Sequence, residues 1–116
     1  MPSEPTAFEF GDVVLVPFPF TDQTAVKRRP AVVISASAYN REKPDVIIMA
    51  VTSQLRPNAS RGELWLQDWS DAGLLKPSAV KPVIATLEQR LVIRTLGRLA
   101  ARDEADLHDA INDIIG

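Results

Sequence analysis

The 116-residue sequence has no cysteine and only one histidine. The absence of cysteine excludes disulfide bonds, thiolate zinc sites and cysteine nucleophiles. The single histidine, His108, excludes a histidine-pair mechanism within one chain and a histidine-rich metal cluster. No stretch approaches the about 18 consecutive apolar residues of a membrane-spanning helix, so no membrane association is expected. Residues 1–6 contain Glu4 and no basic residue, unlike a secretory signal, and a cytoplasmic protein is expected.

The length and composition predict a single folded domain. Apolar residues make up 46% of the chain and charged residues 24%, a balance typical of a globular protein rather than a disordered one. The length matches one compact unit, and no internal repeat or linker divides it, so residues 1–116 are expected to form one domain.

Charge is distributed unevenly along the chain. The formal net charge is −2, from 13 basic and 15 acidic residues. Residues 103–116 hold 5 of those acids and no Lys or Arg, so residues 1–102 have 13 basic against 10 acidic residues, a sum of +3. The densest basic cluster is Lys27-Arg28-Arg29. The net charge argues weakly against a nucleic-acid partner, whereas this distribution leaves room for one.

Short apolar runs predict a mainly β protein. Strands are expected at residues 13–16, 30–35, 45–51, 63–67, 79–87 and 91–99. Residues 1–10 resemble a loose leader, 21–28 a loop, and 36–44 a polar connection. Trp65 lies inside the alternating strand at 63–67 and is expected to pack in the core.

The final segment predicts a helix over residues 103–116. Its apolar residues recur at spacings of three and four, and Asp103 is expected to cap the amino end. Short strands at close spacing, followed by one helix, predict a small antiparallel β-barrel or sandwich. The barrel is favoured because closure hides the sheet edges.

Four segments together resemble the PemK/MazF family of ribonucleases from bacterial toxin–antitoxin systems. They are GDVVLVPFPFTD at 11–22, RRPAVVIS at 28–35, MAVTSQ at 49–54 and LEQ at 87–89. The resemblance implies an SH3-like barrel, a homodimer, and cleavage of single-stranded RNA without metal or cofactor. It also implies a cognate antitoxin whose disordered tail covers the RNA-binding surface, and a DNA-binding complex with that antitoxin.

The resemblance also assigns catalytic positions. The family's arginine before the strand proline falls on Arg29, and its threonine or serine after the third strand falls on Thr52, with Ser53 beside it. Many members have a glycine-rich loop with a Glu-Gln pair before this arginine. Residues 22–28 contain neither glycine nor glutamate, so this chain departs from the family where substrate contacts are expected.

The chemistry of these residues suits RNA cleavage by the substrate's own 2′-hydroxyl. A guanidinium offers a planar fork for two phosphate oxygens, and one such preorganised donor stabilises a transition state by roughly 3–4 kcal/mol. Arg29 precedes Pro30, which favours an extended backbone there. Arginine has a pKa above about 12, which makes it a poor general base, so we expect electrostatic stabilisation from Arg29. Asp22 is the candidate base, and the Thr52 hydroxyl is the candidate donor to a phosphate oxygen.

Further residues are candidates for binding RNA. Cationic side chains hold phosphates, and aromatic rings stack on unpaired bases. The candidates are Lys27, Arg28, Gln54, Arg56 and Trp69. Tyr39 and Trp65 are further possible stacking platforms, although packing in the core is favoured for Trp65.

Two other functions remain open from the sequence. One is a non-enzymatic toxin on the same barrel, resembling the gyrase poison CcdB. The other is an inactive SH3-like binding module.

Overall fold

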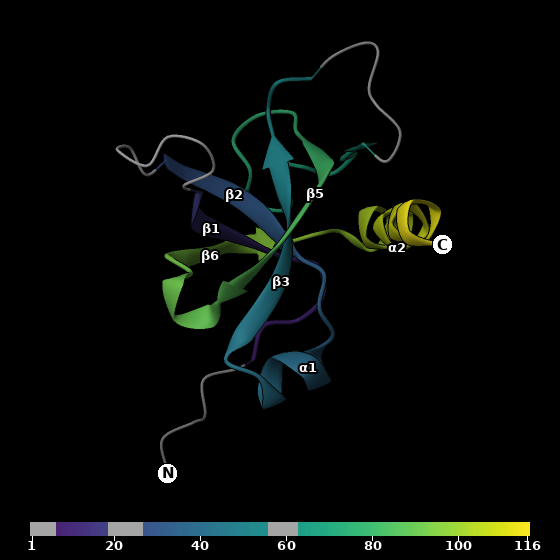
Figure 1. Cartoon of the computed structure of the whole chain (residues 1–116). Helices are drawn as coiled ribbons and strands as arrows, with labels where there is room; N and C mark the ends of the chain where they lie inside the picture. Colours follow the sequence, from purple (N-terminus) through teal and green to yellow (C-terminus); the bar gives the residue numbers. More distant parts are fainter. Residues whose placement is uncertain (1–6, 19–26, 56–62) are drawn as a thin grey trace.

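A computed structural model describes residues 7–18, 27–55 and 63–116. Over these residues the chain forms a curled six-stranded antiparallel sheet in the order β4-β5-β3-β2-β1-β6, with a helix on one side (Figure 1). The prediction of a mainly β fold with a C-terminal helix is confirmed. No helix in the described ranges is both long and apolar enough to cross a membrane. The elements are β1 (Asp12–Phe18), β2 (Lys27–Val33), α1 (Ser37–Glu42), β3 (Asp45–Thr52), β4 (Leu64–Trp65), β5 (Ala79–Glu88), the 3-10 turn η1 (Gln89–Leu91), β6 (Arg94–Arg98) and α2 (Ala101–Ile115).

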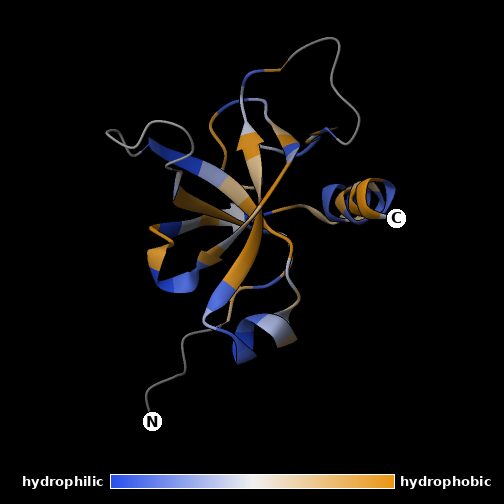
Figure 2. Ribbon diagram, viewed as in Figure 1, coloured by the Kyte–Doolittle hydropathy of each residue, from blue (hydrophilic) through white to orange (hydrophobic). Residues whose placement is uncertain are grey.

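The two faces of the sheet carry two separate apolar clusters. Successive strand residues point to opposite faces, so a strand buried on both sides is apolar along its length, as β3 is between its polar ends Asp45 and Thr52 (Figure 2). The first core cluster includes Val32 and Met49 and is covered by Leu107 of α2. The second core cluster includes Ala31 and Ala50 on the opposite face. Together they fix which residues of each strand share a face.

The sheet closes through a turn rather than through a further strand pair. Gly73 belongs to the turn between β4 and β5, and it has a φ of 85°, which favours glycine. A Cβ at Gly73 would lie 2.1 Å from the Leu96 carbonyl oxygen, and a Cβ at Gly97 would lie 2.4 Å from the Ala72 carbonyl oxygen. Since β4 and β6 are the two edges of the sheet, this backbone contact covers the exposed edge of β6.

The basic cluster lies in a strand, although the sequence places most of it in a loop. β2 begins at Lys27 rather than at Pro30, and β1 continues through Pro17. Pro30 pairs with Leu15 of β1, whereas the pairing of β2 with β3 begins only at Ala31. Each proline therefore lies where its strand has a neighbour on one side, so the missing N–H interrupts no central ladder.

The expected polar connection at 36–44 contains the short helix α1. Its buried Asn40 accepts a hydrogen bond from the Ser35 hydroxyl at 2.5 Å and donates one to the Phe8 carbonyl at 2.7 Å. Buried amides are retained when their polar atoms are paired, as they are here. Asn40 thereby ties α1 to the segment before β1.

That segment is packed from residue 7 onward, so the expectation of a loose leader is wrong for residues 7–10. Phe8 packs against the second core cluster and Phe10 against the first. The Phe10 ring also stacks on His108 of α2, with 3.9 Å between ring centroids. Residues 1–6 of the expected leader lie outside the described residues.

Gln89 of the LEQ segment has a structural role. Its Nε2 donates to the carbonyl oxygens of Asn40, Lys43 and Asp45 at 2.7, 3.0 and 2.9 Å. These carbonyls lie at the end of α1 and the start of β3, where no regular ladder satisfies them. Gln89 therefore fixes η1 against the beginning of β3.

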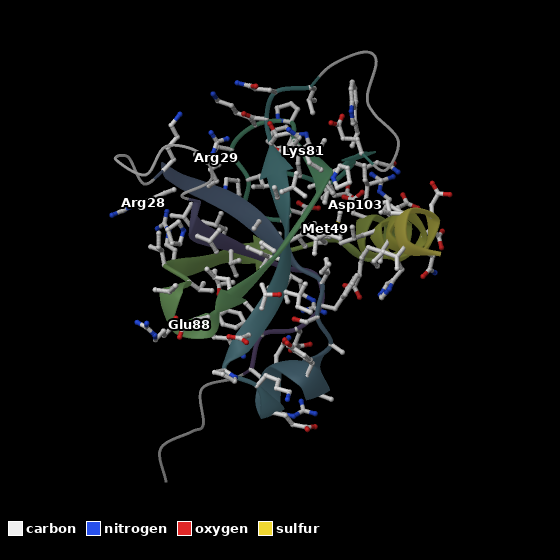
Figure 3. The ribbon with its side chains drawn as sticks, in the orientation of Figure 1. Arg28, Arg29, Met49, Lys81, Glu88 and Asp103 are labelled. Carbon is white, nitrogen blue, oxygen red and sulfur yellow. The ribbon has the colours of Figure 1, made fainter. Side chains whose placement is uncertain are left out.

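The helix begins at Ala101, and Asp103 is not its cap. The N-cap is Ala100, and Asp103 lies in the first turn, fully buried. Its carboxylate accepts the backbone N–H groups of Gln67 and Asp68 at 2.9 and 2.8 Å (Figure 3). The chain between β4 and β5 leaves these two donors unpaired, and the acid satisfies them instead of capping its own helix.

The two tryptophans have different environments: Trp65 is exposed and Trp69 is partly buried. The strand expected at 63–67 is only Leu64–Trp65, and Trp65 is 46% exposed, so the expectation that it packs in the core is wrong. β4 is an edge strand that pairs only with β5, and it contributes Leu64 rather than Trp65 to the first core cluster. Trp69 is partly buried against that cluster.

Replacing Asp103 should destabilise the fold strongly. Asp103→Ala leaves two partly buried N–H donors without a charged acceptor, and we expect a loss of about 3 kcal/mol in the free energy of unfolding. Urea denaturation measures it. Asp109→Ala, at an exposed position of the same helix, is the control and should change stability by less than about 0.5 kcal/mol. Equal midpoints for the two variants would contradict this role.

Gly97→Ala tests the closing contact. The added methyl meets backbone atoms, which cannot rotate away, so we expect a loss of about 3 kcal/mol and a lower melting temperature. Gly116→Ala is the control, because no atom lies within 4 Å of its Cβ position, and strain at its φ of 92° should cost no more than about 1 kcal/mol. Similar melting temperatures for both variants would show that the turn and β6 separate easily.

Candidate functional site

A cleft of about 730 Å³ lies between the start of β2, the end of β3 and the turn that precedes β5. Its walls include Leu15 of β1 and Leu96 of β6, so apolar side chains contribute to the lining. Five cationic residues line it and, among the described residues, no acidic one does. The five are Lys27, Arg28, Arg29, Lys76 and Arg94. The cleft is therefore electropositive in a chain whose net charge is −2.

Acidic side chains neutralise other arginines instead. Arg98 forms ion pairs with Asp12 at 2.9 Å and with Glu9 and Glu104 at longer range. Arg102 donates two hydrogen bonds to Asp68, and this contact lowers the pKa of the Asp68 carboxyl below its ordinary value. The five cleft cations have no such partner within the described ranges.

The sheet register places Arg29 and Thr52 on one face. The last pair between β2 and β3 is Ala31↔Ala50, and both alanines belong to the second core cluster. Two residues further along each strand are Arg29 and Thr52, which therefore project from the same face as those alanines. The pairing stops before reaching them, so the strands separate and the space between them opens. Figure 3 shows Arg28 and Arg29 at this end of β2.

The Thr52 hydroxyl is held in a defined orientation. Its oxygen accepts a hydrogen bond from the Gln54 backbone N–H at 3.1 Å. A hydroxyl that accepts one bond still has its own hydrogen to donate, and here that donor is half-buried at the cleft wall. Ser53 and Gln54 follow it with exposed side chains. This geometry suits donation to a phosphate oxygen.

The structure brings together most of the residues singled out from the sequence. Those that line the cleft are Lys27, Arg28, Arg29, Thr52, Ser53 and Gln54. Trp69 does not line it, because its ring packs against the first core cluster beneath α2. Asp22 and Arg56 lie outside the described residues.

Sequence reasoning missed three residues of the cleft. Lys76 and Leu75 lie in the turn before β5, and Arg94 begins β6 opposite Leu15. Each is an isolated residue in the sequence, far from the basic cluster, and only the closure of the sheet brings it there. Leu75 is 93% exposed, which is unusual for leucine and gives the cleft an apolar rim.

No group of three His, Asp or Glu side chains within the described ranges has the proximity that a metal site needs. The polar side chains that line the cleft are cations, hydroxyls and the amide of Gln54.

Comparison with known proteins identifies the family. Residues 9–115 match the family described as PemK-like, MazF-like toxin of type II toxin–antitoxin system. No curated protein matches the sequence.

Several solved structures share the fold. A mycobacterial endoribonuclease solved in complex with its cognate antitoxin has 20% identity and a TM-score of 0.78, over 95% of this chain and 96% of that chain. MazF in a MazE–MazF complex from Deinococcus radiodurans has 22% identity and a TM-score of 0.75, over 95% and 97%. The Mycobacterium tuberculosis toxin MazF-mt6 has 20% identity and a TM-score of 0.71, over 88% and 93%.

The family match covers nearly the whole described chain, including the strands that build the cleft. The chain therefore belongs to the PemK-like, MazF-like toxin family of type II toxin–antitoxin systems.

Proposed function

We propose that this chain is a toxin endoribonuclease that cleaves single-stranded RNA in the cleft between β2 and β3. The observation that carries the proposal is the placement of Arg29 and Thr52 on one face, in a cleft lined by five cations and, among described residues, no acid. Family membership and the mycobacterial endoribonuclease with the same fold support it.

The proposed reaction uses the RNA's own 2′-hydroxyl and no metal. The 2′-oxygen loses its proton and attacks phosphorus, and the bond from phosphorus to the 5′-oxygen breaks. The products are a 2′,3′-cyclic phosphate and a 5′-hydroxyl, which gains a proton. Arg29 stabilises the extra negative charge on the phosphate oxygens, and Thr52 donates a hydrogen bond to one of them. Ser53 is a secondary donor, and Asp22 is the candidate base.

Binding of the flanking phosphates is assigned to the other cations. Lys27 and Arg28 of β2, together with Lys76 and Arg94 across the cleft, lie where an extended RNA backbone would pass. Gln54 and Arg56 complete the proposed RNA-binding set from the sequence. Trp69, the remaining candidate from the sequence, is partly buried against the first core cluster and does not line the cleft.

We also propose a homodimer that a cognate antitoxin neutralises, acting in the cytoplasm. Exposed apolar residues away from the cleft support a further protein interface; they are Val83, Ile84, Leu91 and Ile93. The solved mycobacterial and Deinococcus relatives, each in complex with an antitoxin, support the partner class. An acidic antitoxin segment would complement the cations of the cleft.

Removing the Arg29 guanidinium should abolish cleavage. We expect Arg29→Ala to lower kcat by about 100- to 1000-fold, the usual effect of losing one preorganised transition-state donor. The measurement is end-mapped cleavage of a long single-stranded RNA in EDTA, with detection of the cyclic phosphate. Arg41→Ala on α1, remote from the cleft, is the matched control and should cleave normally. A fully active Arg29→Ala protein would rule out the central role assigned here.

The cations across the cleft should contribute to the salt dependence of binding. A contact to a single-stranded phosphate contributes about 0.7 to the slope of log K against log salt. We expect Lys76→Ala and Arg94→Ala each to reduce that slope by about this amount. Binding of an uncleavable 2′-O-methyl RNA is measured at several salt concentrations, with Lys43→Ala as the control. Slopes equal to that of the unchanged protein would place the RNA elsewhere.

A further inference from the structure

Trp65 is a large exposed aromatic residue that neither the core nor the cleft accounts for. We propose that its indole stacks on the base of a nucleotide next to the scissile phosphate, which positions the RNA on the catalytic face. This inference rests on the proposed ribonuclease function and assigns a binding residue to the same site.

The strand register places Trp65 on the face that carries Thr52. Thr52 of β3 is paired with Ala79 of β5, and Ala79 is paired with Trp65 of β4. Residues directly opposite in neighbouring strands share a face, so the three side chains form one row across the sheet. Arg29 stands on this same face beyond Thr52. The row therefore runs from the proposed phosphate-binding arginine to the indole.

The spacing along this row suits one nucleotide. Two strand separations divide Thr52 from Trp65, or about 10 Å between their backbones. The residue between them is Ala79, whose methyl group is the smallest side chain of the row and is covered by other atoms of the chain. No large side chain of the row stands between the proposed phosphate position and the indole.

The surroundings of Trp65 favour a nucleic-acid base over a protein partner. A stable protein interface needs a contiguous apolar surface, whereas the residues two positions before and after Trp65 are the polar Glu63 and Gln67. A single indole suffices to stack on a base, and it does so with any base sequence. Lys81 lies two residues after Ala79, near the start of β5 and beside the end of β3, where it adds positive charge (Figure 3).

Kinetics with Trp65 variants test the proposal. We expect Trp65→Ala to raise KM for single-stranded RNA by about ten-fold with kcat changed less than two-fold, because a stacking contact contributes to binding rather than to chemistry. Trp65→Phe retains a ring and should recover most of the affinity. Circular dichroism melting checks that both variants fold.

Fluorescence gives a second readout, because the chain has only two tryptophans. In Trp69→Phe the remaining emission comes from Trp65, and stacking should quench it when a 2′-O-methyl form of the cleaved RNA is added. In Trp65→Phe the remaining emission comes from Trp69, which lies against the core and should change little.

The outcomes separate the inference from the function on which it rests. If the unchanged protein cuts no RNA, the ribonuclease proposal fails and the stacking role fails with it. If the protein cuts RNA but Trp65→Ala has an unaltered KM, or Trp65 emission is insensitive to RNA, only the stacking role fails. A Trp65→Ala protein with normal KM but a changed oligomeric state or antitoxin affinity would assign Trp65 to a protein interface instead.

Discussion

The candidate site depends on the point at which β2 and β3 stop pairing. Their hydrogen-bonded register ends at Ala31↔Ala50, and beyond it the strands separate with Arg29 and Thr52 on the same face. Had the pairing continued, backbone hydrogen bonds would fill the space in which the cleft opens. Pro30 stands at this limit and pairs only with β1, so it is compatible with the divergence and has no N–H to extend the ladder toward β3. The divergence of β2 and β3 therefore both ends their pairing and opens the cleft.

The fold, rather than the net charge of the chain, determines where acidic and basic side chains gather. Asp12 and Asp68 each neutralise an arginine near α2, and the buried Asp103 accepts two backbone donors instead of meeting a cation. Within α2, Asp103 therefore stabilises the closed fold, while Asp109 faces solvent. Because they lie away from the strands at the cleft, a chain with a net charge of −2 presents an electropositive site.

The sequence alone predicted the local elements of this fold. It did not predict the contacts that form only when the sheet closes. The apolar run at 45–51 predicted β3 correctly, since burial on both faces requires such a run. Asp103 looked like a helix cap because its type and position fit one, but the donors it serves are at residues 67 and 68, which sequence spacing cannot place beside it. Lys76 and Arg94 reach the cleft only because glycines allow the turn before β5 to approach the β6 backbone.

The nature of the available side chains also limits how such a site works. With one histidine, and that one stacked on Phe10 at α2, the described cleft has no group of ordinary pKa near neutrality to exchange protons. The reaction proposed above therefore relies mainly on fixed charge and on the positioning of the RNA. Fixed charge is effective when it needs no reorganisation as the reaction proceeds, and a guanidinium on a strand meets that condition better than one on a loop. Placing Arg29 within β2, one residue before a proline, therefore serves the chemistry as well as the fold.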